Sequence, residues 1–402
     1  MSKRSGGAGL LARHVVGFRA ELVRLGYSTS VANRQVALMG QVSRWLAREG
    51  LDATVLATER VESFFQARRA AGCSCLRTRR SVAPLVGYLR RVGVLGEPQP
   101  PVITDPVETL VRAFGVYLVR ERGLVEGTVH AYVRVARVFL SRRRGPDGVD
   151  LTGLTAADVT GFATRACEPL GHSAARGVVS ALRSLLRFLR WEGLTGVALD
   201  QAVLSVAGWD SSLPKAVPAG RVRRLLDGCD RATAIGRRDY AIVLLLARLG
   251  LRAGEVIALE LGDVDWRAGQ IVVRGKGNRW DRLPLPVDVG QAMVDYLCHG
   301  RPASGSRRVF VRHYAPAGAF RAGSGVIRGV LARVCEQANL PYVSPHRLRH
   351  SLASEMLRRG GSLVEIGQVL RHRGAAATAM YAKVDLVRLR TLAQPWPRGA
   401  AA

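Results

Sequence analysis

The sequence is poor in lysine. Only four of its 60 basic residues are lysines, at positions 3, 215, 276 and 383, and the rest are arginines. Arginine keeps its charge at any neutral pH, whereas lysine can release its proton when its surroundings lower its pKa. A lysine in such a chain therefore suggests a chemical role that arginine cannot fill.

Cysteines and long apolar runs are also scarce. The six cysteines are scattered apart from Cys73 and Cys75, and they show no paired CxxC spacing of a zinc site. The longest purely apolar run, 241–247, is far shorter than the roughly 20 residues of a membrane span and predicts a buried helix. Arg13 interrupts the apolar N-terminal segment, which argues against a secretory signal. We expect a reduced, cytoplasmic setting and no membrane-spanning segment.

Acidic residues are about half as numerous as basic ones. The 31 Asp and Glu leave a net charge of +29 and an isoelectric point near 11.3. This excess indicates a polyanionic partner, with nucleic acid as the first candidate and an anionic membrane surface as the second. Because 48% of the residues are hydrophobic and the charges are spread along the chain, we expect a folded protein.

Two proline-rich stretches, 97–106 and 209–218, divide the chain. Proline lacks an amide donor and resists helix formation, so both stretches are predicted to be linkers. The predicted parts are residues 1–97, 106–208 and 219–395. Three parts suit a chain of 402 residues.

The first two parts resemble each other. LATERVESFF from Leu56 aligns without gaps with LTAADVTGFA from Leu154, and LVGYLRRVG from Leu85 aligns with LLRFLRWEG from Leu185. Both parts have apolar residues at helical spacing and almost no strand signal, which predicts about four short helices in each. Duplication of one helical unit is our preferred interpretation, and chance similarity between two arginine-rich bundles is the alternative.

The third part changes character along its length. Helical patterns run through RVRRLLDGC and RRDYAIVLLLARLG, and they return from Gly325 onward. Between them, WRAGQIVVRGKGNRWDRLPLP has two extended runs joined by a Gly-Lys-Gly-Asn turn, which predicts a β-hairpin with Lys276 at its tip. The expected fold class is mainly α, with a small β-hairpin or sheet in the third part.

Candidate site residues flank this hairpin. Arg252 in LGLRAGE follows a helix and a glycine, and Glu255 can orient it. Lys276 can give up a proton, which arginine cannot do near neutral pH. Taken singly, a paired surface arginine and a solvated turn lysine are the ordinary interpretations. Their combination suits a DNA-cutting site without metal, which needs cations for the phosphate oxygens and a proton for the leaving oxygen.

Two later stretches add histidines and a tyrosine. In SPHRLRHSLAS, Pro345 favours a helix start, and His346 and Arg349 lie three residues apart on one helix face. Alone, this stretch is more typical of a basic surface helix. In VLRHRGAAATAMYAKVD, His372 precedes Tyr381 by nine residues, and Gly374 with its small neighbours predicts a turn and a short helix that present the tyrosine.

Together these residues follow the order and approximate spacing of the tyrosine recombinase, or phage integrase, family, which the whole third part resembles. The six positions that match the family's catalytic set are Arg252, Lys276, His346, Arg349, His372 and Tyr381. The second part is similar to the family's helical core-binding, SAM-like domain, and the first part would be a further unit of this kind. An arginine at 371, where glycine is common, and the extra N-terminal unit depart from the pattern.

The resemblance implies a role for each position. Tyr381 would attack the scissile phosphate and form a 3′-phosphotyrosine with release of a 5′-hydroxyl. Arg252 and Arg349 would neutralise the non-bridging oxygens, and Lys276 would protonate the leaving oxygen.

The histidines would share the remaining tasks. The family pattern implies that His346 assists proton transfer at the tyrosine and that His372 donates a hydrogen bond to the phosphate. His350 is assigned to structural support, outside the catalytic set. Neither ATP nor a metal is implied.

The implied function is site-specific recombination of a mobile element by integration, excision or transposition. Its partners would be double-stranded DNA recombination sites and other recombinase protomers in a homo- or hetero-tetrameric synapse, at the nucleoid. The alternatives are a type IB topoisomerase-like enzyme and a DNA-binding regulator without chemistry, which would be expected to lack a catalytic residue. The role of the extra unit stays open between clamping DNA, reading a distant site and contacting a partner protein.

Overall fold

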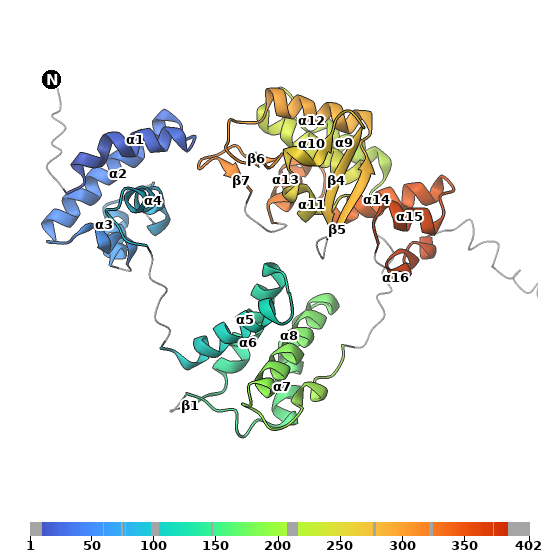
Figure 1. The fold of residues 1–402 in the computed structure, drawn as a ribbon, viewed down its shortest axis with the longest axis horizontal. Coiled ribbons are helices and arrows are strands. Elements are labelled where there is room, and N and C mark those ends of the chain that lie inside the picture. Colours follow the sequence, from blue (N-terminus) through green and yellow to red (C-terminus); the bar gives the residue numbers. More distant parts are fainter. Residues whose placement is uncertain are drawn as a thin grey trace, which may run out of the picture. The chain divides into compact units, whose positions relative to one another are not determined.

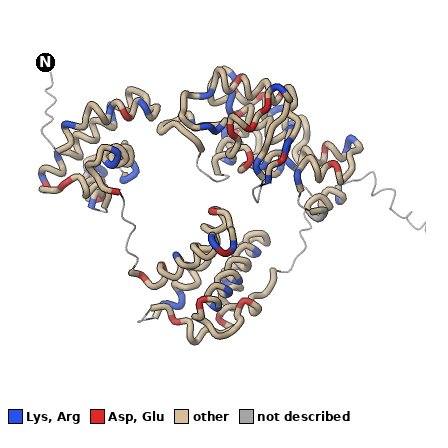
Figure 2. Tube along the Cα trace, viewed as in Figure 1, with Lys and Arg blue, Asp and Glu red and all other residues tan. Residues whose placement is uncertain are grey.

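The computed structural model describes residues 10–58, 60–73, 75–76, 78–97, 104–145, 148–206, 216–275, 279–320, 325–372 and 374–384 (Figure 1). These residues are mostly helical and include three small antiparallel sheets, which confirms the predicted fold class. Lys and Arg occur in every part of the tube in Figure 2. The chain divides into two compact units, residues 99–211 and residues 1–98 with 212–402.

The unit of residues 99–211 is a four-helix bundle with a small hairpin. Its apolar core is centred on aromatic rings, and the Phe114 and Phe188 ring centroids lie 5.4 Å apart. The Asp105 carboxylate caps the first helix by accepting a hydrogen bond from the Val107 amide. The elements are α5 (Pro106–Arg120), α6 (Glu126–Ser141), β1 (Arg144–Gly145), β2 (Gly148–Val149), α7 (Ala156–Cys167), α8 (His172–Trp191) and η4 (Leu199–Ala202).

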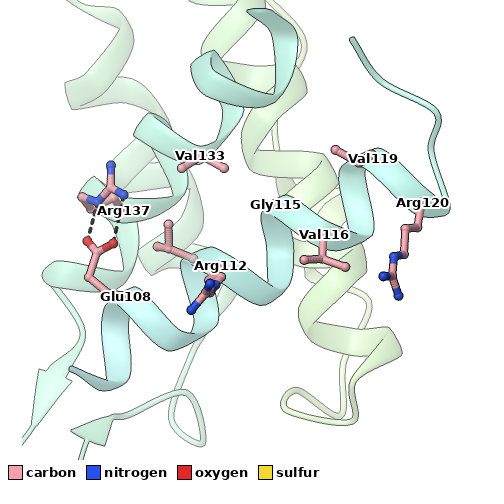
Figure 3. Close-up of a pocket in the computed structure, with 9 residues that line it drawn as sticks. Glu108, Arg112, Gly115, Val116, Val119, Arg120, Val133 and Arg137 are labelled. Atoms are coloured by element: carbon pink, nitrogen blue, oxygen red, sulfur yellow. Dashed lines mark hydrogen bonds and ion pairs between the residues drawn. The ribbon is translucent and has the colours of Figure 1, made fainter. Parts of the chain in front are cut away.

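A shallow pocket lies over α5 and α6 of this bundle (Figure 3). Val116 and Val119 line it and are 46% and 53% exposed. At one end, the Glu108 carboxylate pairs with the Arg137 guanidinium, whose Nη2 lies 2.9 Å from Oε2. The pocket therefore combines exposed apolar side chains with a fixed ion pair.

The N-terminal part, residues 10–97, is also helical. Phe18, Leu22, Leu46 and Phe65 are fully buried in its apolar core. The elements are η1 (Ala12–His14), α1 (Val15–Arg24), α2 (Thr29–Arg48), η2 (Ala53–Ala57), α3 (Val61–Ala70), η3 (Arg79–Val82) and α4 (Ala83–Arg91). Four α-helices among the described residues of each helical part agree with the sequence prediction.

The aligned positions of the two helical parts have matching environments. Each pair of aligned apolar residues is buried: Val61 with Val159, Phe64 with Phe162 and Tyr88 with Phe188. Gly93 and Gly193 both follow a helix with left-handed φ values of 75° and 72°, a conformation that favours glycine. The last helices differ in length, since α4 has nine residues and α8 has twenty. Duplication of one helical unit stays a prediction, with chance similarity as its alternative.

The C-terminal part, from residue 216, combines helices with a three-stranded antiparallel sheet of order β3-β4-β5. Strands β4 (Gln270–Gly275) and β5 (Arg279–Pro284) pair Gly275 with Arg279 and Ile271 with Leu283, which confirms the predicted hairpin. Strand β3 (Val264–Asp265) and the small hairpin of β6 (Val311–Arg312) and β7 (Gly318–Ala319) were not predicted, because two-residue strands leave no periodic pattern.

Helices α9 to α14 of this part contribute to one apolar core, and a second, smaller cluster holds Ala353, Leu357, Ile366, Leu370 and Tyr381. The apolar run 241–247 lies inside α10, as predicted, and most of its residues are fully buried. The elements are α9 (Ala219–Asp227), α10 (Ala234–Arg248), α11 (Ala253–Ala258), η5 (Leu261–Asp263), α12 (Val287–His299), α13 (Gly325–Gln337), α14 (Pro345–Arg358), α15 (Leu363–Val369), α16 (Ala375–Ala379) and η6 (Ala382–Val384).

Several predicted features lie outside the described residues. They are Lys276 at the hairpin tip, residues 1–9, and large parts of both predicted linkers, at 98–103 and 207–215. Within the described ranges, no helix has both the length and the apolar character to cross a membrane.

Candidate active site

Five of the six predicted site residues lie in the described C-terminal part. Arg252 precedes α11, His346 and Arg349 lie on α14, His372 follows α15, and Tyr381 follows α16. Arg252 and Arg349 donate hydrogen bonds to carbonyls of residues 371 and 370, next to His372, and the His372 ring lies parallel to that of Tyr381.

Arg252 is fixed by the carboxylate that the sequence suggested. Its backbone amide donates to Oε2 of Glu255 at 2.8 Å, and its Nη1 donates to Oε1 at 2.6 Å. The Glu255 side chain is 3% exposed and that of Arg252 is 34% exposed. One edge of the Arg252 guanidinium is therefore held from inside the protein while part of the group remains accessible to a ligand.

The Arg349 side chain is buried and links two loops through hydrogen bonds to their backbone carbonyls. Its Nη1 donates to the Gly250 carbonyl and its Nη2 donates to the Leu370 carbonyl. Burial, with Arg252 and Arg371 nearby, lowers the pKa of Arg349 to about 10. Gly250 has a φ of 57°, and an added Cβ would lie 2.8 Å from a Leu370 methyl carbon. Glycine is thus required where these loops approach each other.

Helix α14 begins as predicted, with Ser344 as its N-cap residue and Pro345 in its first turn. His346 is exposed at this end of the helix. Partial burial of the imidazole, together with Arg349 and Arg252, lowers the pKa of His346. At neutral pH this imidazole is therefore mostly uncharged beside the two arginines.

The Tyr381 hydroxyl contacts the other histidine of α14. Nδ1 of His350 lies 2.8 Å from the hydroxyl oxygen, and Tyr381 is only 1% exposed. Burial raises the pKa of Tyr381, an effect that Arg349 partly offsets. Burial, with His346 and Arg349, lowers the pKa of His350. A neutral phenol therefore faces a neutral imidazole.

Sequence reasoning missed this contact, because it gave His350 a supporting role and placed His346 at the tyrosine. The available signal was the i, i+4 spacing that puts both histidines on one face of α14. The partner, Tyr381, lies 31 residues further along the chain. Helical spacing alone does not reveal which of the two rings meets it.

His372 is held by a residue that sequence reasoning also missed. Its Nδ1 lies 2.7 Å from Oγ1 of Thr378, which is 5% exposed, and its ring is parallel to that of Tyr381. Burial, with nearby arginines including Arg349 and Arg252, lowers the pKa of His372 to about 4. The imidazole is therefore neutral at neutral pH. The only hint of Thr378 was a single hydroxyl within a run of alanines.

Comparisons with known proteins identify the family. Residues 215–387 match the phage integrase family, and residues 111–193 match the phage integrase N-terminal SAM-like domain. The chain is 42% identical over 398 residues to integrase/recombinase y4rA of Sinorhizobium fredii, covering 97% of this chain and 95% of the relative. The chain belongs to the phage integrase family of tyrosine recombinases.

A relative named as a tyrosine recombinase matches a smaller share of this chain. Tyrosine recombinase XerC of Nitrobacter winogradskyi is 33% identical over 310 residues, which cover 73% of this chain and 94% of the relative. Residues 1–110 lie outside both family matches. The predicted enzyme class, a tyrosine-type recombinase, is confirmed.

Solved recombinase structures share the fold. XerH recombinase in a post-cleavage complex with palindromic difH substrate has a TM-score of 0.55 at 15% identity, covering 73% of this chain and 97% of that chain. A lambda integrase dimer bound to a COC′ core site has a TM-score of 0.52 at 14% identity, covering 73% and 99%. At these identities, the comparison shows that this tyrosine recombinase shares the fold of the two proteins. It shows nothing about shared roles of residues.

Proposed function

We propose that this tyrosine recombinase cuts and rejoins double-stranded DNA at specific sites through a 3′-phosphotyrosine on Tyr381, during integration, excision or transposition of a mobile element. The observation that carries the proposal is the contact between the Tyr381 hydroxyl and Nδ1 of His350, beside the buried Arg349. This contact gives a nucleophile a proton acceptor next to a fixed cation.

The arginines are suited to the non-bridging phosphate oxygens. Arg349 is held by two backbone carbonyls, and Arg252 is held by Glu255 with part of its side chain exposed. Cations fixed before the substrate arrives need no reorganisation when charge develops on the phosphate. We assign the Thr378 hydroxyl as the donor to Nδ1 of the neutral His372, which places the ring proton on Nε2, where it can serve a third phosphate contact.

The proton path begins at Tyr381. As its oxygen bonds to phosphorus, its proton passes to Nδ1 of His350, which is 2.8 Å away. We assign this step to His350 in place of His346, because His350 makes the contact. The bond from phosphorus to the 5′-oxygen breaks, and Lys276 supplies the proton to the leaving oxygen. The scarcity of lysine in the sequence supports this role.

Double-stranded DNA is the proposed partner, in a synapse of four protomers. The net charge of +29 supports a polyanionic ligand. The XerH and lambda integrase structures with a similar fold are complexes with DNA. Because many arginine–phosphate contacts would release counterions, affinity should fall steeply with salt. An affinity that is insensitive to salt would contradict this part of the proposal.

Outward-directed PCR from the two ends of the DNA segment that carries the gene tests the biological role. Joined ends, which mark excision, should appear in cells with the wild-type protein and be absent with Tyr381→Phe. In vitro, two sites on one plasmid should recombine. Relaxation of supercoils without exchange of the sites would indicate a topoisomerase-like activity and contradict the proposal.

A further inference from the structure

Arg371, the residue before His372, has an unusual backbone conformation. Its φ is 55°, in the left-handed region that favours glycine. Non-glycine residues are held in this region only where surrounding contacts stabilise them, commonly at functional sites. The contacts that hold Arg371 in this conformation therefore point to a functional role for its side chain.

The Arg371 guanidinium contacts the carboxylate that holds Arg252. Its Nη2 donates to Oε2 of Glu255 at 2.7 Å, and the two side chains are 5% and 3% exposed. Oε1 of the same carboxylate accepts the hydrogen bond from Arg252 at 2.6 Å. Nε of Arg371 also lies 3.9 Å from Oδ2 of Asp281 on β5.

The backbone of Arg371 closes this cluster into a ring. Nη2 of Arg252 donates to the Arg371 carbonyl at 3.3 Å. Arg252 is thus joined to Arg371 in two ways, directly through the carbonyl and indirectly through Glu255. The loop that carries His372 is thereby connected to the residue at the start of α11.

The charges of this cluster are unequal. Glu255 would neutralise Arg252 if the two formed an isolated pair, but here one carboxylate is shared by two guanidinium groups. Burial would raise the pKa of Glu255, but Arg371 and Arg252 hold it below its usual value, so the carboxylate stays charged. The two arginines and Glu255 together keep one net positive charge, which the Asp281 carboxylate offsets only in part, since it is 37% exposed and lies 3.9 Å from Nε of Arg371.

We propose that Arg371 is a positioning residue that holds Glu255 and, through it, Arg252, and that leaves the positive charge of Arg252 available to the scissile phosphate. The inference rests on the proposed role of Arg252 in phosphate binding. It predicts that cleavage falls when the charge at position 371 is removed, both in a variant that relieves the backbone strain and in one that keeps it.

Three substitutions separate charge from strain. Arg371→Gly removes the charge and relieves the strain, Arg371→Met removes the charge and keeps the strain, and Arg371→Lys keeps both. Single-turnover cleavage of a nicked DNA substrate should fall on the order of 10- to 100-fold in the Gly and Met variants, because Arg252 loses its fixed position. Arg371→Lys should recover most of that rate, since an ammonium can pair with Glu255.

Asn339→Gly is the matched control for strain, since Asn339 also has a left-handed φ, of 49°, in the loop after α13. Its cleavage rate should equal that of the wild type. Thermal unfolding identifies any variant that does not fold, and the comparison of Arg371→Met with Arg371→Lys remains decisive if Arg371→Gly fails. Wild-type cleavage in the neutral variants, or a lysine variant as slow as the folded neutral ones, would overturn the inference. Absence of cleavage by the wild-type protein would instead contradict the proposed function.

Discussion

Nδ1 of His350 lies 2.8 Å from the hydroxyl oxygen of Tyr381. Helix α14 supplies the histidine, and the turn after α16 supplies the tyrosine. The lowered pKa of His350 and the raised pKa of Tyr381 leave both groups neutral near pH 7. The pair is therefore ready for proton transfer from oxygen to nitrogen when Tyr381 attacks a phosphate.

Substitution of His350 should slow cleavage and change its pH dependence. Only the neutral imidazole can accept a proton, so the wild-type rate should rise with pH through a pKa below 6.5 and then level off. His350→Gln should lower the single-turnover rate on the order of 100-fold at pH 7.5 and abolish this rise. His346→Gln is the matched control and should keep the rise. If His346→Gln abolished the rise and His350→Gln kept it, His346 would be the residue that accepts the tyrosine proton.

Thr378→Val should impair His372 without a large change in shape. The hydroxyl that bonds Nδ1 at 2.7 Å would be lost, and the imidazole would no longer be held in one tautomer. We expect cleavage to fall about tenfold, the equivalent of one lost hydrogen bond in a buried site. Thr378→Ser should retain the wild-type rate. Nitrogen-15 NMR of His372 should show a mixture of tautomers in the valine variant, and an unchanged spectrum and rate would contradict this role for Thr378.

Lys276→Arg tests whether the scarce lysine is a proton donor. The charge is kept, so DNA affinity should stay within about twofold of the wild type, but cleavage should slow on the order of 100-fold because arginine holds its proton. A substrate with sulfur in place of the 5′-bridging oxygen should restore the rate, since a thiolate leaves without protonation. Lys3→Arg is the charge-preserving control. Equal slowing of the variant on both substrates would exclude the general-acid role.

Elements with a strong local signal could be predicted from the sequence. The β4–β5 hairpin follows from two extended runs around a glycine-rich turn, and the start of α14 follows from Pro345. The pairing of Arg252 with Glu255 follows from their separation of three residues at a helix start. Each of these features depends on residues that are neighbours in the chain.

Features that depend on distant contacts could not be predicted. His350 meets Tyr381, and Arg371 meets Glu255, only because separate helix ends converge in the folded chain. In the sequence, the arginine at position 371 is only a departure from the family pattern, since a sequence shows neither a left-handed φ nor a buried ion pair. Tertiary packing decides these contacts, and hydrophobic periodicity does not encode them.

Formation of a covalent protein–DNA adduct most directly tests the central claim, nucleophilic attack by Tyr381. The wild-type protein, incubated with a recombination site nicked beside the cleavage position, should form an adduct that survives denaturation with detergent. Proteolysis and mass spectrometry should place the nucleotide on Tyr381, and Tyr381→Phe should bind the same DNA without forming the adduct. An adduct on another residue, or one that persists in Tyr381→Phe, would contradict the mechanism.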